Sequence, residues 1–249
     1  SENTRTVTVS IGGIPATPTC TALAWNTGAV NVTALSQGSV AITASHTDAV
    51  LNSGSASATA TKDTIGPALT IGTLAVINNA NLAAYSFTGA CETGGSTVSF
   101  SLISGATVSG SSACTAGAYT AAPGTLAELT DGVVSVSVTQ TDALGNSTTS
   151  TGTTTKDAAN PTVAITAPAA ITVANQAAYS VSGTCSENTR AVSVLIGGVP
   201  VAPSPTCAAL AWNTGPVNVS GLADGSVAIT ASHTDAVLNS ASASTTTTK

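Results

Sequence analysis

Charged and aromatic side chains are scarce in this chain of 249 residues, at 6% and 3%, and methionine is absent. Five Lys and Arg residues and a net charge of −6 argue against binding to nucleic acid or to an anionic membrane surface, because both require clustered positive charge. No run of about 18 apolar residues occurs, so we expect no membrane insertion in this segment. What remains is rich in Thr, Ser, Ala, Val and Gly, a composition that favours strands over helices.

The chain contains an internal repeat. Gly38–Ser53 is identical to Gly225–Ser240, and a more diverged copy lies between them. The anchor residues recur at steps of 94 and then 93 residues: Cys20, Cys114 and Cys207; Asp48, Asp142 and Asp235; Asn52, Asn146 and Asn239; Lys62, Lys156 and Lys249. A period of this size indicates an array of small domains. We predict a partial domain over residues 1–62 (repeat 1), which lacks its first strands, and complete domains over 63–156 (repeat 2) and 157–249 (repeat 3).

Alternating apolar and polar residues predict the strands of repeat 3: 162–166, 177–185, 191–196, 217–219, 226–234 and 240–249. Short strands separated by frequent turns are typical of an immunoglobulin-like sandwich. The predicted fold class is therefore all-β, with tandem immunoglobulin-like domains that form an elongated rod. The near identity of repeats 1 and 3 predicts closely similar surfaces for both. Because the chain begins within a repeat, we expect it to be a segment of a longer polypeptide.

The five cysteines occupy matching places in the repeats. Cys91 and Cys114 are 23 residues apart in repeat 2, and Cys185 and Cys207 are 22 apart in repeat 3. Two thiols per repeat are too few for a tetrahedral zinc site, so the spacing predicts one structural disulfide in each of these repeats and an oxidising, extracellular location. Cys20 matches Cys114 and Cys207, and its expected partner is a residue before Ser1.

The junction sequences Asp63-Thr-Ile-Gly-Pro67 and Asp157-Ala-Ala-Asn-Pro161, with Asp142-Ala-Leu-Gly-Asn146, resemble the tandem bacterial immunoglobulin-like repeats of giant surface adhesins and biofilm-associated fibre proteins. The resemblance implies a stalk or fibre at the cell surface, and in several such families acidic residues at domain junctions bind calcium. Oxygen ligands from a loop and a linker suit that cation. Asp142, Asn146 and Asp157 are accordingly a candidate calcium site, although Asp and Asn are also ordinary turn residues. No other cofactor is expected.

Four other groups of residues admit a functional interpretation. Trp25 and Trp212 each follow a cysteine by five residues, and they are either core residues or platforms for surface glycans. His46 and His233 precede an aspartate, but repeat 2 has Gln140 there and no nucleophile is evident, so we expect no catalysis. Lys62, Lys156 and Lys249 end their repeats and are expected to be solvated rather than cross-linked. Asn31, Asn146 and Asn218 begin glycosylation sequons.

The function favoured by these patterns is a noncatalytic extracellular structural protein, a repeat segment of a surface adhesin, stalk or fibre. One alternative is the protomer of a filament whose subunits exchange strands, because repeat 1 lacks the counterpart of residues 162–185. The other is a carbohydrate-binding repeat array. The expected partners are neighbouring repeats or subunits of the same protein, and glycans in the second alternative.

Overall fold

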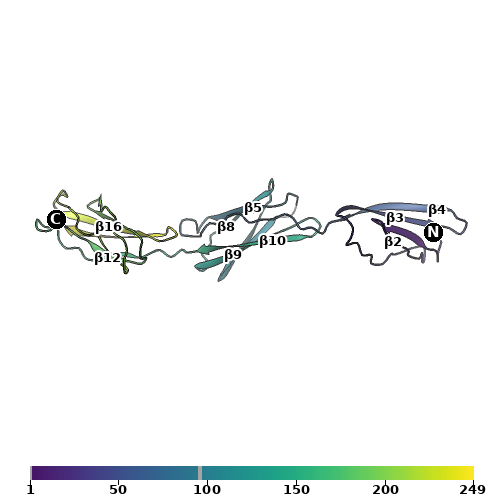
Figure 1. Cartoon of the computed structure of the whole chain (residues 1–249), viewed down its shortest axis with the longest axis horizontal. Helices are drawn as coiled ribbons and strands as arrows, with labels where there is room; N and C mark the ends of the chain where they lie inside the picture. Colours follow the sequence, from purple (N-terminus) through teal and green to yellow (C-terminus); the bar gives the residue numbers. More distant parts are fainter. Residues whose placement is uncertain (1, 95–96) are drawn as a thin grey trace. The chain divides into compact units, whose positions relative to one another are not determined.

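The computed structural model describes residues 2–94 and 97–249, and Ser1, Gly95 and Ser96 lie outside the described residues. The regular elements of the described ranges are the β-strands β1 to β17 (Figure 1). None of these ranges contains a helix with the length and apolar character needed to cross a membrane. The chain divides into two compact units, Ser1–Pro67 with Thr141–Thr148, and Ala68–Gln140 with Thr149–Lys249.

Repeat 1 forms one four-stranded antiparallel sheet. Its order is β2-β1-β3-β4, and its strands are β1 (Val7–Ile11), β2 (Ile14–Ala16), β3 (Gly38–Thr47) and β4 (Ser53–Lys62). The buried apolar cluster is small and consists of Val7, Val9 and Cys20, with four partly buried residues packed against it. Nearly all of β4 is exposed. The sheet therefore has a well-formed ladder but little core.

Repeat 2 forms two sheets around one core. The first has the order β10-β9-β6-β7 and the second consists of β5 and β8. The strands are β5 (Tyr85–Ala90), β6 (Val98–Ser104), β7 (Ala106–Ser112), β8 (Ala118–Gly124), β9 (Gly132–Thr141) and β10 (Ser147–Lys156). Alternate residues of β9 point inward, among them Val134, Val136 and Val138, as a half-buried strand requires.

Repeat 3 is also a two-sheet sandwich, with orders β14-β13-β16-β17 and β11-β12-β15. The strands are β11 (Val163–Ile165), β12 (Ser182–Cys185), β13 (Val192–Ile196), β14 (Val199–Pro200), β15 (Ala211–Asn213), β16 (Ser226–Thr234) and β17 (Ser240–Thr248). Side chains from both sheets form one apolar cluster that includes Tyr179, Trp212 and Ile229. The predicted all-β, immunoglobulin-like class is confirmed.

Two predicted strands of repeat 3 are shorter than the alternation suggests. The strand expected over 177–185 is regular only in β12, and the strand expected over 217–219 is reduced to a bridge between Tyr179 and Val217. The register changes by one residue between the two pairings, because Tyr179 lies opposite Val217 whereas Ser182 lies opposite Asn213, and the ladder is interrupted between them. The predicted inward face is nevertheless correct, because Tyr179, Val181 and Cys185 are buried.

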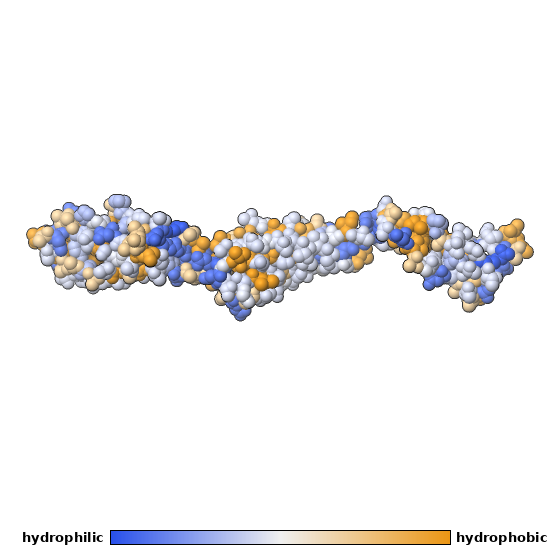
Figure 2. Space-filling view, turned by 60° about the horizontal axis from the view of Figure 1, so that its bottom comes forward, coloured by the Kyte–Doolittle hydropathy of each residue, from blue (hydrophilic) through white to orange (hydrophobic). Residues whose placement is uncertain are grey.

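The exposed surface is only weakly polar. On the face shown in Figure 2, residues of intermediate hydropathy cover most of the surface, and strongly hydrophobic or hydrophilic residues form small separate groups. Ser and Thr make up nearly all of β10 and most of β17, and their outward side chains are short hydroxyls of this intermediate character. Such a surface has few charges with which to bind a charged partner.

Candidate functional site: the strand clip and the junction loop

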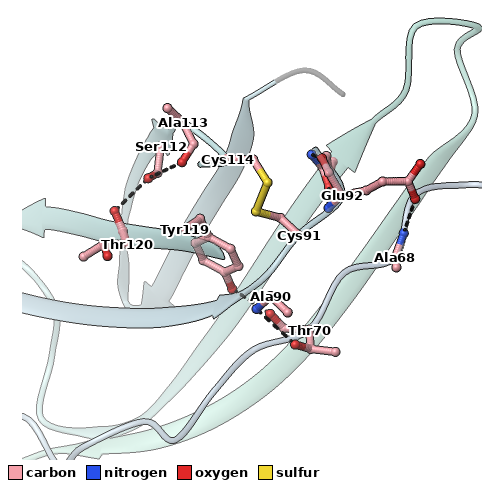
Figure 3. The surroundings of a disulfide bond; sticks show 11 residues. Ala68, Thr70, Ala90, Cys91, Glu92, Ser112, Ala113, Cys114, Tyr119 and Thr120 are labelled. Carbon is pink, nitrogen blue, oxygen red and sulfur yellow. Dashed lines mark hydrogen bonds between the residues drawn. A yellow bond between two sulfur atoms is a disulfide. The ribbon is translucent and has the colours of Figure 1, made fainter. Parts of the chain in front are cut away.

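A disulfide joins Cys91, at the end of β5, to Cys114, between β7 and β8, as the spacing predicts (Figure 3). Tyr119 lies beside it, and its hydroxyl donates a hydrogen bond of 3.0 Å to the carbonyl oxygen of Thr70. Gly89 faces the Tyr119 ring so closely that a Cβ atom there would overlap both the ring and the Thr70 carbonyl oxygen. Disulfide, aromatic ring and glycine together hold the segment before β5 against the sheet. We call this arrangement the strand clip.

Repeat 3 contains the same strand clip. Cys185 and Cys207 form the second disulfide, and Trp212 takes the place of the tyrosine. The indole Nε1 donates hydrogen bonds of 3.2 Å to the carbonyl oxygens of Ala164 and Thr184. Gly183 pairs with Trp212 in the ladder and leaves room for its ring. Trp212 is 3% exposed, so it is a core residue and cannot be a glycan platform.

Repeat 1 contains only part of the strand clip, namely one cysteine and the aromatic residue. Cys20 is buried and is the free cysteine among the described residues, and Trp25 is 43% exposed. The prediction that repeats 1 and 3 have closely similar surfaces is therefore wrong. The identical side chains have different surroundings because the strands that cover them in repeat 3 have no counterpart in repeat 1.

A second arrangement, the junction loop, connects the hairpin between β16 and β17 to the linker that opens repeat 3. Asp235 accepts hydrogen bonds from the backbone N–H groups of Val237 and Asn239 and from the Asn239 amide. The same amide nitrogen donates to the carbonyl oxygen of Asp157 at 2.9 Å. The Asn239 Oδ1 in turn accepts a bond of 2.8 Å from the N–H of Asn79, in repeat 2.

The junction loop thus ties three segments together. Asn78 adds a bond of 2.6 Å from its amide to the carbonyl oxygen of Val237, and Asn79 donates one of 2.7 Å to Asn160. Asp235 and Asn239 are 1% and 2% exposed. A buried asparagine bonded to both the linker and the preceding repeat fixes the backbone where one repeat follows another.

Repeat 2 has the same loop at the hairpin between β9 and β10. Asp142 accepts bonds from the N–H groups of Leu144 and Asn146 and from the Asn146 amide, which also donates to the carbonyl oxygen of Asp63 at 3.3 Å. Asp142 and Asn146 therefore lie together, as predicted, but their linker partner is Asp63. Asp157 instead contacts Asn239. The reason is that β10 runs ten residues away from the hairpin, which is about 33 Å of extended chain.

The junction loop does not fit a calcium ion. The space between the Asp142 carboxylate and the Asp63 carbonyl oxygen is filled by the Asn146 amide nitrogen, a donor, and calcium requires six to eight oxygen ligands. The hydrogen bond from Asn146 is the main cause that holds the pKa of Asp142 below its usual value. Across residues 2–94 and 97–249, no group of three His, Cys, Asp or Glu side chains could hold a metal ion. The carboxylate is stabilised by protein N–H groups.

The side chain at the position of His46 and His233 has a structural role. The Nε2 atom of His233 accepts a bond from the N–H of Glu187, and its Nδ1 lies 3.2 Å from the carbonyl oxygen of Ala191. In repeat 2, Gln140 accepts the equivalent bond from the N–H of Glu92 and donates a second one to the carbonyl oxygen of the same residue. Both side chains fasten the bend that follows the first cysteine of the repeat to the adjacent long strand, β16 or β9. The ring nitrogens of His233 are therefore occupied by backbone contacts.

The terminal lysines differ from the prediction of solvated side chains. Lys156 is buried, and its ammonium group lies 2.6 Å from Asp131. Lys62 and Lys249 donate to loop carbonyl oxygens, Leu35 and Thr33 for the first and Leu222 and Ser220 for the second. Each ammonium group thus fastens the loop before the long hairpin, because a cation that is partly or fully removed from water needs such acceptors.

Some features of the junction loop could not be seen in the sequence pattern. Leu51 and Leu238 adopt positive φ angles of 70° and 72°, at the position that Gly145 occupies in repeat 2 with 93°. The aligned glycine was the available signal, because it indicates a left-handed backbone at that position. The asparagine turn at Asn78 and Asn79 lies about 160 residues from its partners, a contact that no local pattern predicts.

No protein-family model and no curated protein matches this sequence. Among solved structures, the chain is similar to a tetra-tandem repeat from the extending region of a large adhesion protein, with 23% identity and a TM-score of 0.36 over 99% of this chain and 67% of that one. It is also similar to a Ca²⁺-stabilised adhesin with which an Antarctic bacterium binds ice, with 23% identity and a TM-score of 0.43 over 99% and 65%. A third similar structure is from a 1.5-MDa bacterial ice-binding adhesin, with 22% identity and a TM-score of 0.45 over 98% and 84%. The chain spans about two thirds of the first two.

Proposed function

We infer that this chain is a noncatalytic repeat segment of an extracellular adhesin, stalk or fibre at the cell surface. The observation that carries the proposal is the junction loop, in which buried Asn239 binds Asp157 of the linker and Asn79 of the preceding repeat. A stalk must transmit position from one repeat to the next, and a linker bonded on both sides does this better than a free one.

The disulfides and the surface support an extracellular location. Disulfides persist in oxidising environments and are rare in the cytosol, and each of the two complete repeats has one. A Ser- and Thr-rich surface of low charge keeps a crowded fibre soluble without strong attraction to neighbouring molecules. The similarity to adhesin repeats agrees with this role.

The test of the proposal uses antibodies against the recombinant chain. They should label intact, unpermeabilised source cells, and brief surface proteolysis should remove the signal. A signal that appears only after permeabilisation would contradict the proposal.

The same antibodies separate a giant chain from a filament of small protomers. After boiling in denaturant with reductant, a giant chain gives a species far larger than 23.8 kDa. A band near this size would favour the filament of strand-exchanged subunits.

The glycan alternative has only Trp25 as an exposed platform, because Trp212 is buried.

A further inference from the structure

One face of the repeat 1 sheet, which we call the open face, is formed by residues of β1, β3 and β4 that include Val7, Ala44 and Ala56. Gly38–Ser53 is identical to Gly225–Ser240, yet the two stretches have different burial. In repeat 3, Ala231, His233, Asp235 and Asn239 are buried. Their counterparts in repeat 1, which are Ala44, His46, Asp48 and Asn52, are all partly or fully exposed.

The exposed residues surround a hollow. Its volume is about 620 Å³, and Val7, Trp25, Ala44, His46 and Ala56 line it. These side chains are those of a sandwich core, whereas the surface of a single finished sheet would carry polar groups at such positions. The sequence at this face is therefore that of one half of a sandwich.

Repeat 3 shows what covers such a face. Residues 157–185 supply the covering strands: β12 pairs with β15, and Ala164 and Thr184 accept from the Trp212 indole. The Asp157 carbonyl also accepts from Asn239, to which Asn79 of the preceding repeat adds one bond. In repeat 1, Ala24–Asn26 correspond to β15 but form no strand, since the partner strand has no counterpart. The covering strands that repeat 1 lacks thus correspond to one continuous segment of repeat 3.

The backbone contact that follows this segment in repeat 3 is also present in repeat 1. In repeat 3, Cys185 leads through Ser186 into Glu187, whose N–H donates to the Nε2 of His233. In repeat 1, the N–H of Glu2 donates to the Nε2 of His46 in the same way. A segment joined ahead of Glu2 would therefore arrive on the open face with the register that β12 has in repeat 3.

We propose that the open face of repeat 1 binds an extended polypeptide segment with the pattern of residues 157–185, joined directly ahead of Ser1 and ending in a cysteine that forms a disulfide with Cys20. The occupant is this two-strand segment, and it completes the sandwich as residues 157–185 complete repeat 3. Its Gly-x-Cys ending places a glycine against Trp25, as Gly183 lies against Trp212.

The disulfide forms by exchange with a small-molecule disulfide such as oxidised glutathione. The segment's thiolate first attacks that disulfide and releases one glutathione thiolate. The Cys20 thiolate then attacks the segment's sulfur and releases the second. Two protein thiols are oxidised, one disulfide is reduced to two thiols, and the two protons pass to solvent.

The test compares the 249-residue chain with a chain extended by a copy of residues 157–185 ahead of Ser1, both refolded in a glutathione redox buffer. Acrylamide should quench Trp25 in the original chain, and the variant Trp25→Phe should lose this accessible fraction. In the extended chain, the accessible fraction should fall at least about fivefold, since Trp212 is already inaccessible. Mass mapping should find Cys20 joined to the new cysteine.

Two matched extensions keep the proposal falsifiable. Replacing the new cysteine by Ser should preserve the protection of Trp25 without the disulfide, which separates strand binding from cross-linking. Replacing the glycine that corresponds to Gly183 by Val should abolish protection, because its side chain would overlap the Trp25 ring. If the unaltered extension leaves Trp25 as accessible as before, the proposal fails. It also fails if the original chain protects Trp25 by forming a concentration-dependent dimer that the extension does not displace.

Discussion

The side chain of Asn239 donates a hydrogen bond of 2.9 Å to the backbone carbonyl of Asp157, although the two residues lie at opposite ends of the repeat 3 sequence. The same asparagine contacts Asp235 and Asn79 and is 2% exposed. One side chain therefore closes a hairpin, fixes a linker and meets the preceding repeat. Its counterpart in repeat 1, Asn52, closes only the hairpin and is exposed.

This difference predicts unequal costs for the same substitution. Asn239→Ala leaves the buried Asp235 carboxylate and the Asn79 N–H short of partners and should destabilise repeat 3 by about 2–3 kcal/mol. Asn52→Ala should cost less than about 1 kcal/mol, because water replaces the lost bonds. Native-state hydrogen exchange over residues 226–248 and 38–62 measures both, since it resolves each repeat separately. Equal losses in the two repeats would contradict this account of the junction loop.

The junction loop also predicts a stabilising substitution. Leu238 has a φ of 72° and is 73% exposed, so it adopts the left-handed conformation without burying its side chain. That conformation costs a non-glycine residue about 1–2 kcal/mol, which glycine avoids. Glycine is also more flexible in the unfolded chain, and this flexibility offsets about 0.5–1 kcal/mol of the gain in stability. Leu238→Gly should therefore raise the free energy of unfolding of repeat 3 by about 0.5–1 kcal/mol.

The reverse change in repeat 2 is the control. Gly145→Leu places a side chain at a φ of 93° and should destabilise the hairpin between β9 and β10 by about 1 kcal/mol or more. Hydrogen exchange of β16 and β17 for the first variant, and of β9 and β10 for the second, reads each effect locally. Two changes of the same sign would show that backbone strain is not the deciding cause.

The all-β class, the repeat pattern and the cysteine pairs could be predicted from the sequence, because each depends on local alternation or on a fixed period. Trp212 and Trp25 show where this reasoning stops. Their surroundings in the chain are nearly the same, but one is a core residue and the other is exposed, because burial depends on strands that are distant in the sequence. The pairing of Asn146 with Asp63 rather than Asp157 depended on the direction of one strand, which local patterns do not specify.

Calcium should not change the stability of this segment. At the junction loop, N–H groups already satisfy Asp142, and an amide nitrogen lies where a cation would need oxygen ligands. Thermal midpoints in millimolar calcium and in excess chelator should agree within about 1 °C, because a ligand raises stability only when it binds the folded state. A midpoint that rises with calcium concentration and loses this response in Asp142→Asn would overturn the assignment.

Alkaline pH should weaken the two complete repeats through their buried tyrosines. Burial raises the pKa of Tyr179 and of Tyr85 above the usual value of 10.0. The unfolded chain therefore loses these protons at a lower pH than the folded chain does, so stability is intact below pH 10.0 and falls as the pH rises beyond it.

Tyr179→Phe should reduce this alkaline loss in repeat 3. Its cost at neutral pH should be below about 1 kcal/mol, because the Thr247 hydroxyl still donates to the Ala169 carbonyl oxygen. Denaturant unfolding monitored by Trp212 fluorescence between pH 8 and 11 measures the difference. The background carries Trp25→Phe, so that Trp212 is the single tryptophan, and Cys20→Ser, so that the free thiol cannot exchange with the disulfides. An alkaline loss of the same size in Tyr179→Phe and in the parent would place its origin in another group.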